Sequence, residues 1–507
     1  MVRIMSSGKE KQMYNAYITK IKNIRPHPNA DRLNLGECFG NTVVIGKDYD
    51  ENTLYAYFPT DGQLSTEYAV TNDLLRRKDD AGNPAGGYLD PDKRNIRAMK
   101  LRGEKSDGLV MPLSSFEYTG VDLSSLTEGT TINVLNGHEI CTKYIPRTNK
   151  TNGEPIGNRT RNKKVPVAPL FAEHADTEQL AYNLSAFRPN DEIEITLKIH
   201  GTSQRTGYLP VFKGYKQDFW GRLLCCINTD KKMKPFVAKL YEKAIRNATP
   251  IYDWGYVSGT RRTVLNNYDG GYYGSNEFRE THSKFFEGKL QKGETVYYEV
   301  CGFTNTGVPI MSSCNNKKLN DKEFIKQYGE ETVFSYGCSP DGTTELSMSE
   351  TGLPYGAVVP RSQSDIYVYR MTITNEEGFV VEYTPDFMRY RCEQMGVKCV
   401  PTLWKGAIPN EESLKQLAFI TDDIGEFKEW IPTSAGEYIK DIAEQYYDGP
   451  DPIGKTHIRE GVVVRIINRP KFAAYKHKNF SFKVLEGIVK ANAEAPDMEE
   501  AQEETTE

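Results

Sequence analysis

The sequence predicts an α+β fold in which a small β-rich N-terminal domain precedes a larger mixed domain. Short strand candidates, separated by Pro, Gly, Asn and Asp, cluster near the start at residues 16–21, 42–45 and 55–58. Many short strands of this kind are typical of a small barrel or sandwich. Longer apolar strands follow at residues 294–302 and 366–371, and residues 236–245 carry apolar side chains at helical spacing.

Length and composition set the outer limits of the interpretation. A chain of 507 residues is long enough for two or three domains. Its composition, 38% hydrophobic and 26% charged, is that of a globular protein, and it contains no apolar run long enough to span a bilayer. The start has no apolar segment typical of a signal peptide, and the nine cysteines form no C-x-x-C pair. We therefore expect a reduced, cytoplasmic protein without a membrane partner or a cysteine-bound zinc site.

The net charge of −5 is dominated by the last residues of the chain. Residues 491–507 contain seven acidic side chains and no basic one, which leaves 64 basic against 62 acidic residues in the rest. A tail with this charge and few apolar residues is predicted to be disordered. The nearly neutral remainder neither supports nor excludes a nucleic-acid partner, so local clusters must decide.

Residues 1–142 form the predicted N-terminal module. Within it, residues 24–33 (Ile-Arg-Pro-His-Pro-Asn-Ala-Asp-Arg-Leu) resemble the opening of tRNA-binding modules of the OB type, although a Pro-rich turn between strands has the same composition. A basic strand and loop follow, and basic side chains at this spacing are suited to contact a phosphate backbone. The candidate RNA-binding residues are Arg97, Lys100 and Arg102.

A basic linker is predicted at residues 143–167, with seven basic residues and one acidic residue among Pro, Gly and Asn. Two interpretations remain open. The segment is either a solvated linker or a basic strap over phosphates, which belong to RNA or to a nucleotide.

The candidate nucleophile is Lys198. The preceding residues 192–197 alternate polar and apolar side chains, so they are predicted to form a strand that presents Lys198 at its end, followed by His200, Gly201 and Thr202. An amine attacks only after losing its proton, and desolvation and neighbouring cations favour that loss. On this stretch alone, a surface lysine that ends a strand is the simpler interpretation.

Later segments supply further chemistry in a fixed order. Residues 255–265 are predicted to form a strand that carries Arg261 and Arg262. Glu299 stands inside an apolar strand, and Tyr369 lies in an aromatic one. A carboxylate in an apolar strand needs a cation, a hydroxyl or the water shell of a metal. Further along come Glu460, at the head of an apolar strand, and the alternating pair Lys476 and Lys478. Each of these residues alone could be a structural ion pair or a solvent-facing side chain.

Taken in this order, the segments resemble the covalent nucleotidyltransferases, that is, polynucleotide ligases and mRNA capping enzymes. The resemblance implies a domain of antiparallel sheets with flanking helices over residues 168–490, with unexplained insertions at 209–250, 305–360 and 385–455. It implies that Lys198 is the nucleophile and that His200, Gly201 and Thr202 bind the nucleotide. It further implies that Arg261 or Arg262 contacts the ribose and that Tyr369 stacks on the adenine. Glu299 and Glu460 would contact the ribose and the water shell of the metal. The α-phosphate would be contacted by Lys476 and Lys478.

A second segment competes for the role of nucleophile. Lys105-Ser106-Asp107-Gly108 fits the K-x-D-G pattern of these enzymes more literally than Lys198-Ile199-His200-Gly201. It lacks a comparable arginine strand and glutamate strand close behind it. We therefore expect Lys105 not to be the nucleophile.

Within the superfamily, Lys198-Ile199-His200-Gly201-Thr202-Ser203 resembles the K-x-H-G-T-[NS] motif of RNA ligases. The order of the domains, with the OB-like module first, is similar to that of the RNA ligases typified by those of Naegleria and Deinococcus. His200 stands where many relatives have aspartate. This difference leaves open whether position 200 holds the metal's waters or hydrogen-bonds the nucleotide.

The function implied by the resemblance is ATP-dependent sealing of RNA ends, with a 3′-hydroxyl and a 5′-phosphate joined at nicks through lysyl-AMP and RNA-adenylate. The implied cofactors are ATP and Mg²⁺ or Mn²⁺, and the implied partner is nicked or paired RNA. Two alternatives remain open: a capping-type enzyme that uses GTP, and a non-catalytic RNA-binding protein built on the N-terminal module.

Overall fold

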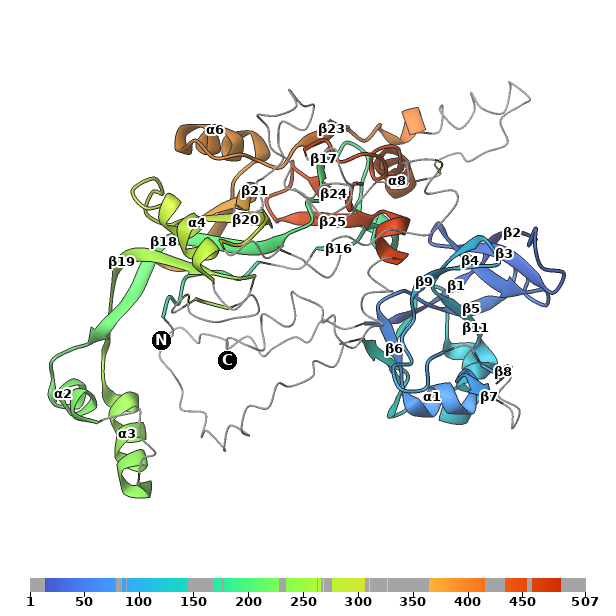
Figure 1. Ribbon diagram of the computed structural model, residues 1–507, viewed down its shortest axis with the longest axis horizontal. Coiled ribbons are helices and arrows are strands. Elements are labelled where there is room, and N and C mark those ends of the chain that lie inside the picture. Colours follow the sequence, from blue (N-terminus) through green and yellow to red (C-terminus); the bar gives the residue numbers. More distant parts are fainter. Residues whose placement is uncertain are drawn as a thin grey trace.

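The computed structural model describes residues 14–78, 84–87, 89–144, 167–174, 177–227, 234–261, 263–265, 268, 276–305, 310, 326, 364–414, 434–453 and 458–484. The predicted linker, except at its two ends, and the acidic tail lie outside these residues. The described chain is an α+β protein with mainly antiparallel sheets (Figure 1). No helix within the described ranges is long and apolar enough to cross a membrane.

The N-terminal part is built from short strands, as predicted. A four-stranded sheet has the order β11-β5-β1-β12 and a three-stranded sheet the order β2-β3-β4. Their strands are β1 (Ala16–Lys20), β2 (Lys22–Pro26), β3 (Leu33–Cys38), β4 (Asn41–Gly46), β5 (Leu54–Phe58), β11 (Leu109–Pro112) and β12 (Thr131–Ile132). Two-stranded pairs join β6 (Gly62–Leu64) to β15 (Cys141–Lys143), β7 (Arg77–Lys78) to β8 (Pro84–Gly86), β9 (Ala98–Leu101) to β10 (Glu104–Asp107) and β13 (Val134–Leu135) to β14 (His138–Glu139).

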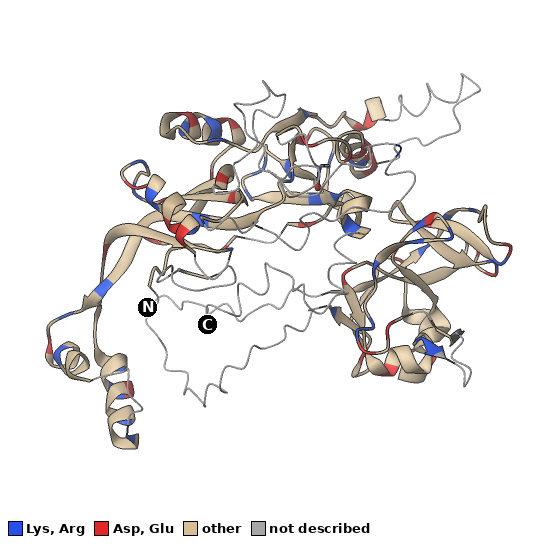
Figure 2. Ribbon diagram, viewed as in Figure 1, with Lys and Arg blue, Asp and Glu red and all other residues tan. Residues whose placement is uncertain are grey.

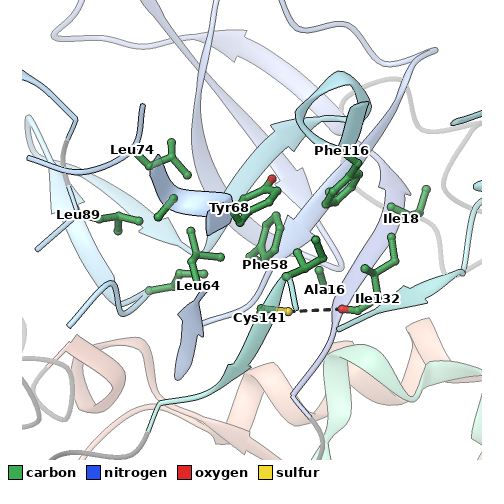
Figure 3. Packing of buried hydrophobic residues seen from close by; sticks show 14 of the residues in the cluster. Ala16, Ile18, Phe58, Leu64, Tyr68, Leu74, Leu89, Phe116, Ile132 and Cys141 are labelled. Carbon is green, nitrogen blue, oxygen red and sulfur yellow. Dashed lines mark hydrogen bonds between the residues drawn. The ribbon is translucent and has the colours of Figure 1, made fainter. Parts of the chain in front are cut away.

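The predicted closed barrel is not found among the described strands. Closure requires the two outer strands of a sheet to pair, with a regular stagger. Here the outer strands β11 and β12 of the four-stranded sheet are not neighbours in any described ladder, and β12 has only two residues. The sheets instead enclose an apolar core together with α1 (Thr66–Thr71) and the 3-10 helices η1 (Leu113–Thr119) and η2 (Leu123–Ser125). Figure 3 shows Phe58, Tyr68 and Phe116 packed in this core.

The larger part contains two five-stranded sheets. The first has the order β16-β25-β24-β17-β23, and its strands are β16 (Glu178–Gln179), β17 (Glu192–Leu197), β23 (Thr402–Ala407), β24 (Gly461–Ile466) and β25 (Ala473–Lys478). The second has the order β19-β18-β20-β21-β22, and its strands are β18 (Thr202–Tyr215), β19 (Pro250–Gly259), β20 (Glu294–Gly302), β21 (Ser364–Thr374) and β22 (Val380–Glu382). All pairings are antiparallel except the short one between β16 and β25, which is parallel.

Helices flank these sheets and extend from them. The long β18–β19 hairpin carries α2 (Phe219–Cys226) and α3 (Pro235–Asn247) at its far end, away from the rest of the molecule (Figure 1). The helix predicted at residues 236–245 is therefore present, as α3. The other elements are α4 (Glu277–Phe285), α6 (Pro385–Met395), α8 (Ala435–Tyr446) and the 3-10 helices η3 (Leu180–Tyr182) and η4 (Leu184–Ala186). In Figure 2, basic and acidic residues are interspersed along the helices and the sheets.

Lys198 lies where the chain passes from one large sheet to the other. β17 of the first sheet ends at Leu197, and β18 of the second sheet begins at Thr202. The junction rests on a small apolar cluster to which the first sheet contributes Leu197 and the second sheet contributes Cys301 and Tyr367. Burial of these side chains fixes the two sheets against each other beneath the connection.

Candidate nucleotidyl-transfer site

The backbone at Leu197 and Lys198 is hydrogen-bonded to the chain segments on both sides of β17. The Leu197 N–H donates to the Pro401 carbonyl at 2.9 Å, and the Lys198 N–H donates to the Gly461 carbonyl at 3.0 Å. Gly461 directly follows Glu460 and begins β24. The same ladder that positions Lys198 therefore positions the candidate carboxylate.

Glu460 is the centre of a compact charged cluster. Lys198 Nζ lies 2.8 Å from Glu460 Oε1, and Lys478 Nζ lies 3.2 Å from the same oxygen. His200 Nδ1 lies 3.5 Å from Glu460 Oε2. The Glu460 side chain is only 4% exposed, whereas that of Lys198 is 21% exposed, so the amine has access to a ligand while the carboxylate lies beneath it. Four of the residues predicted from the sequence thus meet in one place.

The electrostatics of the cluster keep Glu460 ionised. Burial alone would raise the pKa of Glu460, but the ammonium groups of Lys198 and Lys478 and the hydrogen bond from His200 hold it well below its usual value. A carboxylate with such a low pKa accepts a proton only weakly. Glu460 is therefore suited to orient cations, not to act as a general base.

Gly201 brings the second sheet close to the cluster. A Cβ atom at position 201 would lie 2.4 Å from the Val300 carbonyl oxygen and 2.8 Å from Glu299 Cγ. Only a residue without a side chain fits between the nucleophile segment and β20. The close approach places the Glu299 side chain beside Gly201.

Tyr369 lies on the neighbouring strand of the same sheet. Its hydroxyl is 2.8 Å from Ser203 Oγ, five residues after Lys198. Burial, and then the charge of Glu299, raise the pKa of Tyr369, so the phenol stays neutral. The ring is therefore an apolar surface with an anchored polar end.

Tyr369 belongs to an aromatic group that the sequence did not reveal. The His174 ring lies 5.1 Å from the Tyr369 ring, 5.5 Å from Tyr297 and 6.0 Å from Phe472. Arg370 donates to His174 Nδ1 at 3.1 Å, and its guanidinium lies over the rings of Tyr297 and Phe472. Because these residues come from distant segments, no local pattern could have indicated the group.

Arg261 is tied to this aromatic group through its backbone. The His174 N–H donates to the Arg261 carbonyl at 3.0 Å. The positive charge of Arg261 partly opposes the rise in the pKa of Tyr369. The preceding turn is fixed by the buried Arg205, whose Nε donates to the Thr260 carbonyl at 2.9 Å. Burial lowers the pKa of Arg205 to about 10, and Arg205 remains a cation at neutral pH. Arg262 lies outside the described residues.

Lys476 and Lys478 occupy one face of β25, because side chains alternate along a strand. Lys478 contacts Glu460, and Lys476 lies opposite Val463 of β24 and Gln179 of β16. His477, on the reverse face, is buried and stacks on Tyr447 with ring centroids 4.7 Å apart. The alternation predicted from the sequence thus separates two site lysines from a core histidine.

Arg279 and Phe482 are further residues at the site that sequence reasoning missed. Arg279, from α4, donates to Thr202 Oγ1 at 2.7 Å and to the Ser203 carbonyl at 3.1 Å, so it holds the loop after the nucleophile. Phe482 packs edge-on against His200, with ring centroids 5.0 Å apart. Neither residue stands in a segment with a recognisable pattern.

The other predicted residues lie on the N-terminal β9–β10 hairpin. Lys100 is opposite Lys105 in this hairpin, and Arg97 immediately precedes β9. Arg102 forms the turn, with a φ of 49°, and the Asn29 side chain donates to its carbonyl at 3.0 Å. The Lys105 ammonium lies 5.3 Å from the Phe480 ring centroid, not in the Glu460 cluster.

The donor set argues against a metal site made of protein ligands alone. Within the described ranges, no group of three or more His, Cys, Asp and Glu side chains is arranged to hold a metal ion. Glu460 is already engaged by two lysines, and Glu299 stands nearby as a single carboxylate. These residues fit a hard cation that is bound mostly by phosphate oxygens and water.

Comparison with known proteins identifies similar structures only. No family model and no curated protein matches the sequence. The fold is similar to solved structures of an RNA ligase from Naegleria gruberi. A mutant with ATP and manganese has a TM-score of 0.49 and 15% identity, over 92% of this chain and 98% of that one. An apo mutant gives 0.48 and 15%, over 93% and 97%, and a mutant with AMP and manganese gives 0.48 and 14%, over 94% and 99%.

Proposed function

We propose that this protein is an ATP-dependent RNA ligase that joins a 3′-hydroxyl to a 5′-phosphate through lysyl-AMP and RNA-adenylate intermediates. The observation that carries the proposal is the cluster in which Lys198 and Lys478 share one oxygen of the buried Glu460. An amine at a strand end, oriented by an ionised carboxylate and flanked by a second cation, is suited to attack a phosphorus atom. The ordered motifs that resemble ligases point the same way.

In the first step, the Lys198 ammonium loses a proton to solvent and its amine attacks the α-phosphorus of ATP. An N–P bond forms, the bond from the α-phosphorus to the bridging oxygen breaks, and pyrophosphate departs with that oxygen. The amine proton passes to solvent, since the pKa of Glu460 is held well below its usual value by Lys198, Lys478 and His200 against the opposing effect of burial. Lys478 offsets the negative charge of the phosphoryl group as it transfers.

The nucleoside binds across the second sheet. The Tyr369 ring, anchored by its hydroxyl to Ser203, provides a surface on which adenine stacks. Arg261, held by the backbone of His174, and Glu299, beside Gly201, contact the ribose. His200, Gly201 and Thr202 line the loop beneath, and Arg279 fixes the position of Thr202. Lys476 completes the phosphate contacts from the same face as Lys478.

In the second step, an oxygen of the RNA 5′-phosphate attacks the phosphorus of lysyl-AMP, the N–P bond breaks, and the departing nitrogen takes a proton from solvent, which regenerates the Lys198 amine. In the third step, the 3′-hydroxyl attacks the RNA 5′-phosphorus, its proton is lost to solvent and AMP departs. Both steps are phosphoryl transfers, which depend mainly on positioning and charge neutralisation. The same cluster serves all three steps.

A divalent cation, Mg²⁺ or Mn²⁺, would supply further charge neutralisation at the phosphates. Glu299 and Glu460 are the carboxylates that would reach its water shell. Arg97, Lys100 and Arg102, on the β9–β10 hairpin, are the proposed contacts to the RNA backbone. The preferred substrate is a nick in a duplex, where both ends are held by pairing.

The decisive experiment is incubation of the purified protein with α-labelled ATP or α-labelled GTP and Mg²⁺ or Mn²⁺, followed by addition of a nicked RNA duplex. We expect a covalent adduct with ATP only, and transfer of the label first to the RNA 5′ end and then to free AMP as the nick is sealed. An adduct with GTP only would identify a capping-type enzyme. A protein that binds RNA but forms no adduct would be a non-catalytic RNA-binding protein.

A further inference from the structure

The segment Lys105-Ser106-Asp107-Gly108, which is not expected to supply the nucleophile, contacts the chain just after β25. Asp107 Oδ2 lies 2.6 Å from Lys483 Nζ, and the Lys105 ammonium lies over the Phe480 ring. Lys483 and Phe480 belong to a helical turn at residues 480–484, directly after β25. The N-terminal part therefore holds the chain just beyond the candidate catalytic lysine pair.

The ion pair between Asp107 and Lys483 joins a buried carboxylate to a partly buried ammonium. The side chains are 7% and 14% exposed, and the Tyr57 hydroxyl donates to the Asp107 carbonyl at 2.6 Å. The Tyr57 hydroxyl in turn lies 3.5 Å from the hydroxyl of Tyr182, which belongs to the larger part of the protein. A buried carboxylate is strongly destabilising unless it remains paired with a cation, so this contact favours one arrangement of the two parts.

Residues 478–483, which hold the partner of Asp107, also contact the proposed site. Lys478 contacts Glu460, the Asn479 N–H donates to the Glu460 carbonyl at 2.9 Å, and Phe482 packs against His200. The turn is internally stiff, since the Ser481 N–H donates to Asn479 Oδ1 at 2.7 Å and the Lys483 N–H donates to the Asn479 carbonyl at 3.0 Å. Six consecutive residues, 478–483, thus connect Asp107 to the side chain and the backbone carbonyl of Glu460.

We propose that Asp107 is a positioning residue for nucleotidyl transfer, which acts through Lys483 to hold residues 478–483 against Glu460 and His200. The K-x-D-G segment of the N-terminal part is then a latch on the proposed site, not a second nucleophile.

The inference rests on the proposed function for its kinetic test. Asp107→Asn keeps the shape of the side chain and removes its charge, and Lys483→Met removes the ammonium. At saturating ATP, we expect each variant to form the lysyl adduct about tenfold more slowly, a typical size for coupling between two sites. The ATP concentration at half-maximal rate should change by less than about twofold, because Asp107 and Lys483 themselves make none of the proposed nucleotide contacts.

Two further variants separate positioning from general loss of stability. The double variant Asp107→Asn/Lys483→Met should be no slower than either single variant, since both remove one interaction. Lys483→Arg should recover most of the rate, because the charge is retained. Lys398→Met is a control for the loss of a lysine–carboxylate pair as such, since Lys398 Nζ also lies 2.6 Å from a carboxylate, that of Asp365, although its side chain is more exposed, at 60%. Its adduct rate should stay at the wild-type value.

Hydrogen exchange tests the latch without catalysis. In Asp107→Asn, backbone amides of residues 478–484 should exchange at least about fivefold faster than in the wild type, and those of β20 should not change. Unchanged exchange at 478–484, or a wild-type adduct rate in a folded Asp107→Asn protein, would overturn the latch. Absence of any adduct in the wild type would instead reject the proposed function and leave the exchange result to decide the latch alone.

Discussion

Two tetrapeptides of this chain, Lys198-Ile199-His200-Gly201 and Lys105-Ser106-Asp107-Gly108, have similar sequences and different surroundings. Lys198 contacts a buried carboxylate and a second lysine lies beside it, whereas Lys105 is exposed and lies over an aromatic ring. The third residue differs in the same way. His200 faces the carboxylate of Glu460, and Asp107 is neutralised by Lys483. The chemistry of a lysine thus depends on what the fold places beside it.

The glycines differ as well. Gly201 is required because β20 passes too close for a side chain. Gly108 is required by its φ of 127° and by the Tyr57 ring, which would lie 2.5 Å from a Cβ atom at that position. One glycine brings a carboxylate toward a lysine, and the other allows a strand to turn. A motif match alone does not distinguish these uses.

The largest expected effect compares the two lysines directly. Lys198→Ala should abolish the ATP adduct, a loss of at least about a thousandfold, because the attacking amine is removed. Lys105→Ala should keep the rate within about threefold. Adduct formation is measured by retention of α-labelled phosphate on the denatured protein, with circular dichroism to verify folding. If Lys105→Ala eliminates the adduct and Lys198→Ala does not, the assignment of Lys198 as the nucleophile is wrong.

Glu460→Gln should have the next largest effect. The change leaves the ammonium groups of Lys198 and Lys478 near a neutral side chain, so we expect a loss of about 3 kcal/mol in unfolding free energy and about a hundredfold in adduct rate. Glu194→Gln is the control, because Glu194 is a buried carboxylate of β17 that pairs with Arg389 outside the cluster. It should reduce stability in urea titrations and leave the adduct rate nearly intact. Equal rate losses in both variants would contradict the role of Glu460.

Gly201→Ala and Gly108→Ala should separate activity from stability. Both add a Cβ atom within 3.0 Å of backbone, so each should destabilise the protein by about 2 kcal/mol. Only Gly201→Ala moves Glu299 away from the nucleophile segment. In folded protein below the unfolding transition, it should therefore slow adduct formation by more than about tenfold, whereas Gly108→Ala, which acts only by displacing the adjacent Asp107, should slow it by no more than about tenfold. A rate loss confined to Gly108→Ala would reverse our assignment of the two segments.

The smallest expected effect concerns stability at acidic pH. Burial, with Lys483 and Lys440 nearby, lowers the pKa of His477 to about 3, below its value of 6.5 in the unfolded chain. The unfolded state therefore binds a proton that the native state does not, and stability falls as the pH drops from about 6.5 toward 3. His477→Phe should reduce this loss by about 1 kcal/mol between pH 6.5 and 5.5, measured by urea unfolding. An identical pH slope in the variant would show that His477 is not the group responsible.

Much of the larger part follows from local sequence. Residues 192–197 and 294–302 are strands with the predicted bounds, since apolar alternation or continuous apolar character identifies a strand without knowledge of its neighbours. The meeting of Lys198, Glu460 and Lys478 was anticipated by the order of the motifs. Their function remains a prediction until the adduct is tested.

The rest depends on contacts between distant segments. Closure of a barrel is decided by which outer strands pair, and short strands such as β12 carry little information about their partners. His174 and Phe472 meet only because the fold brings together segments from opposite ends of the larger part. Asp107 was visible in the sequence, but its partner Lys483 is separated from it by most of the chain. Such residues become apparent only in three dimensions.

The order of strands in the first large sheet has a consequence during protein synthesis. β17, which presents Lys198, pairs with β24 on one side and β23 on the other, and both strands are made much later than β17. A nascent chain therefore carries the lysine long before Glu460 and Lys478 emerge from the ribosome. The proposed site therefore assembles only after Glu460 and Lys478 have been synthesised, so a chain that stops before them cannot form it.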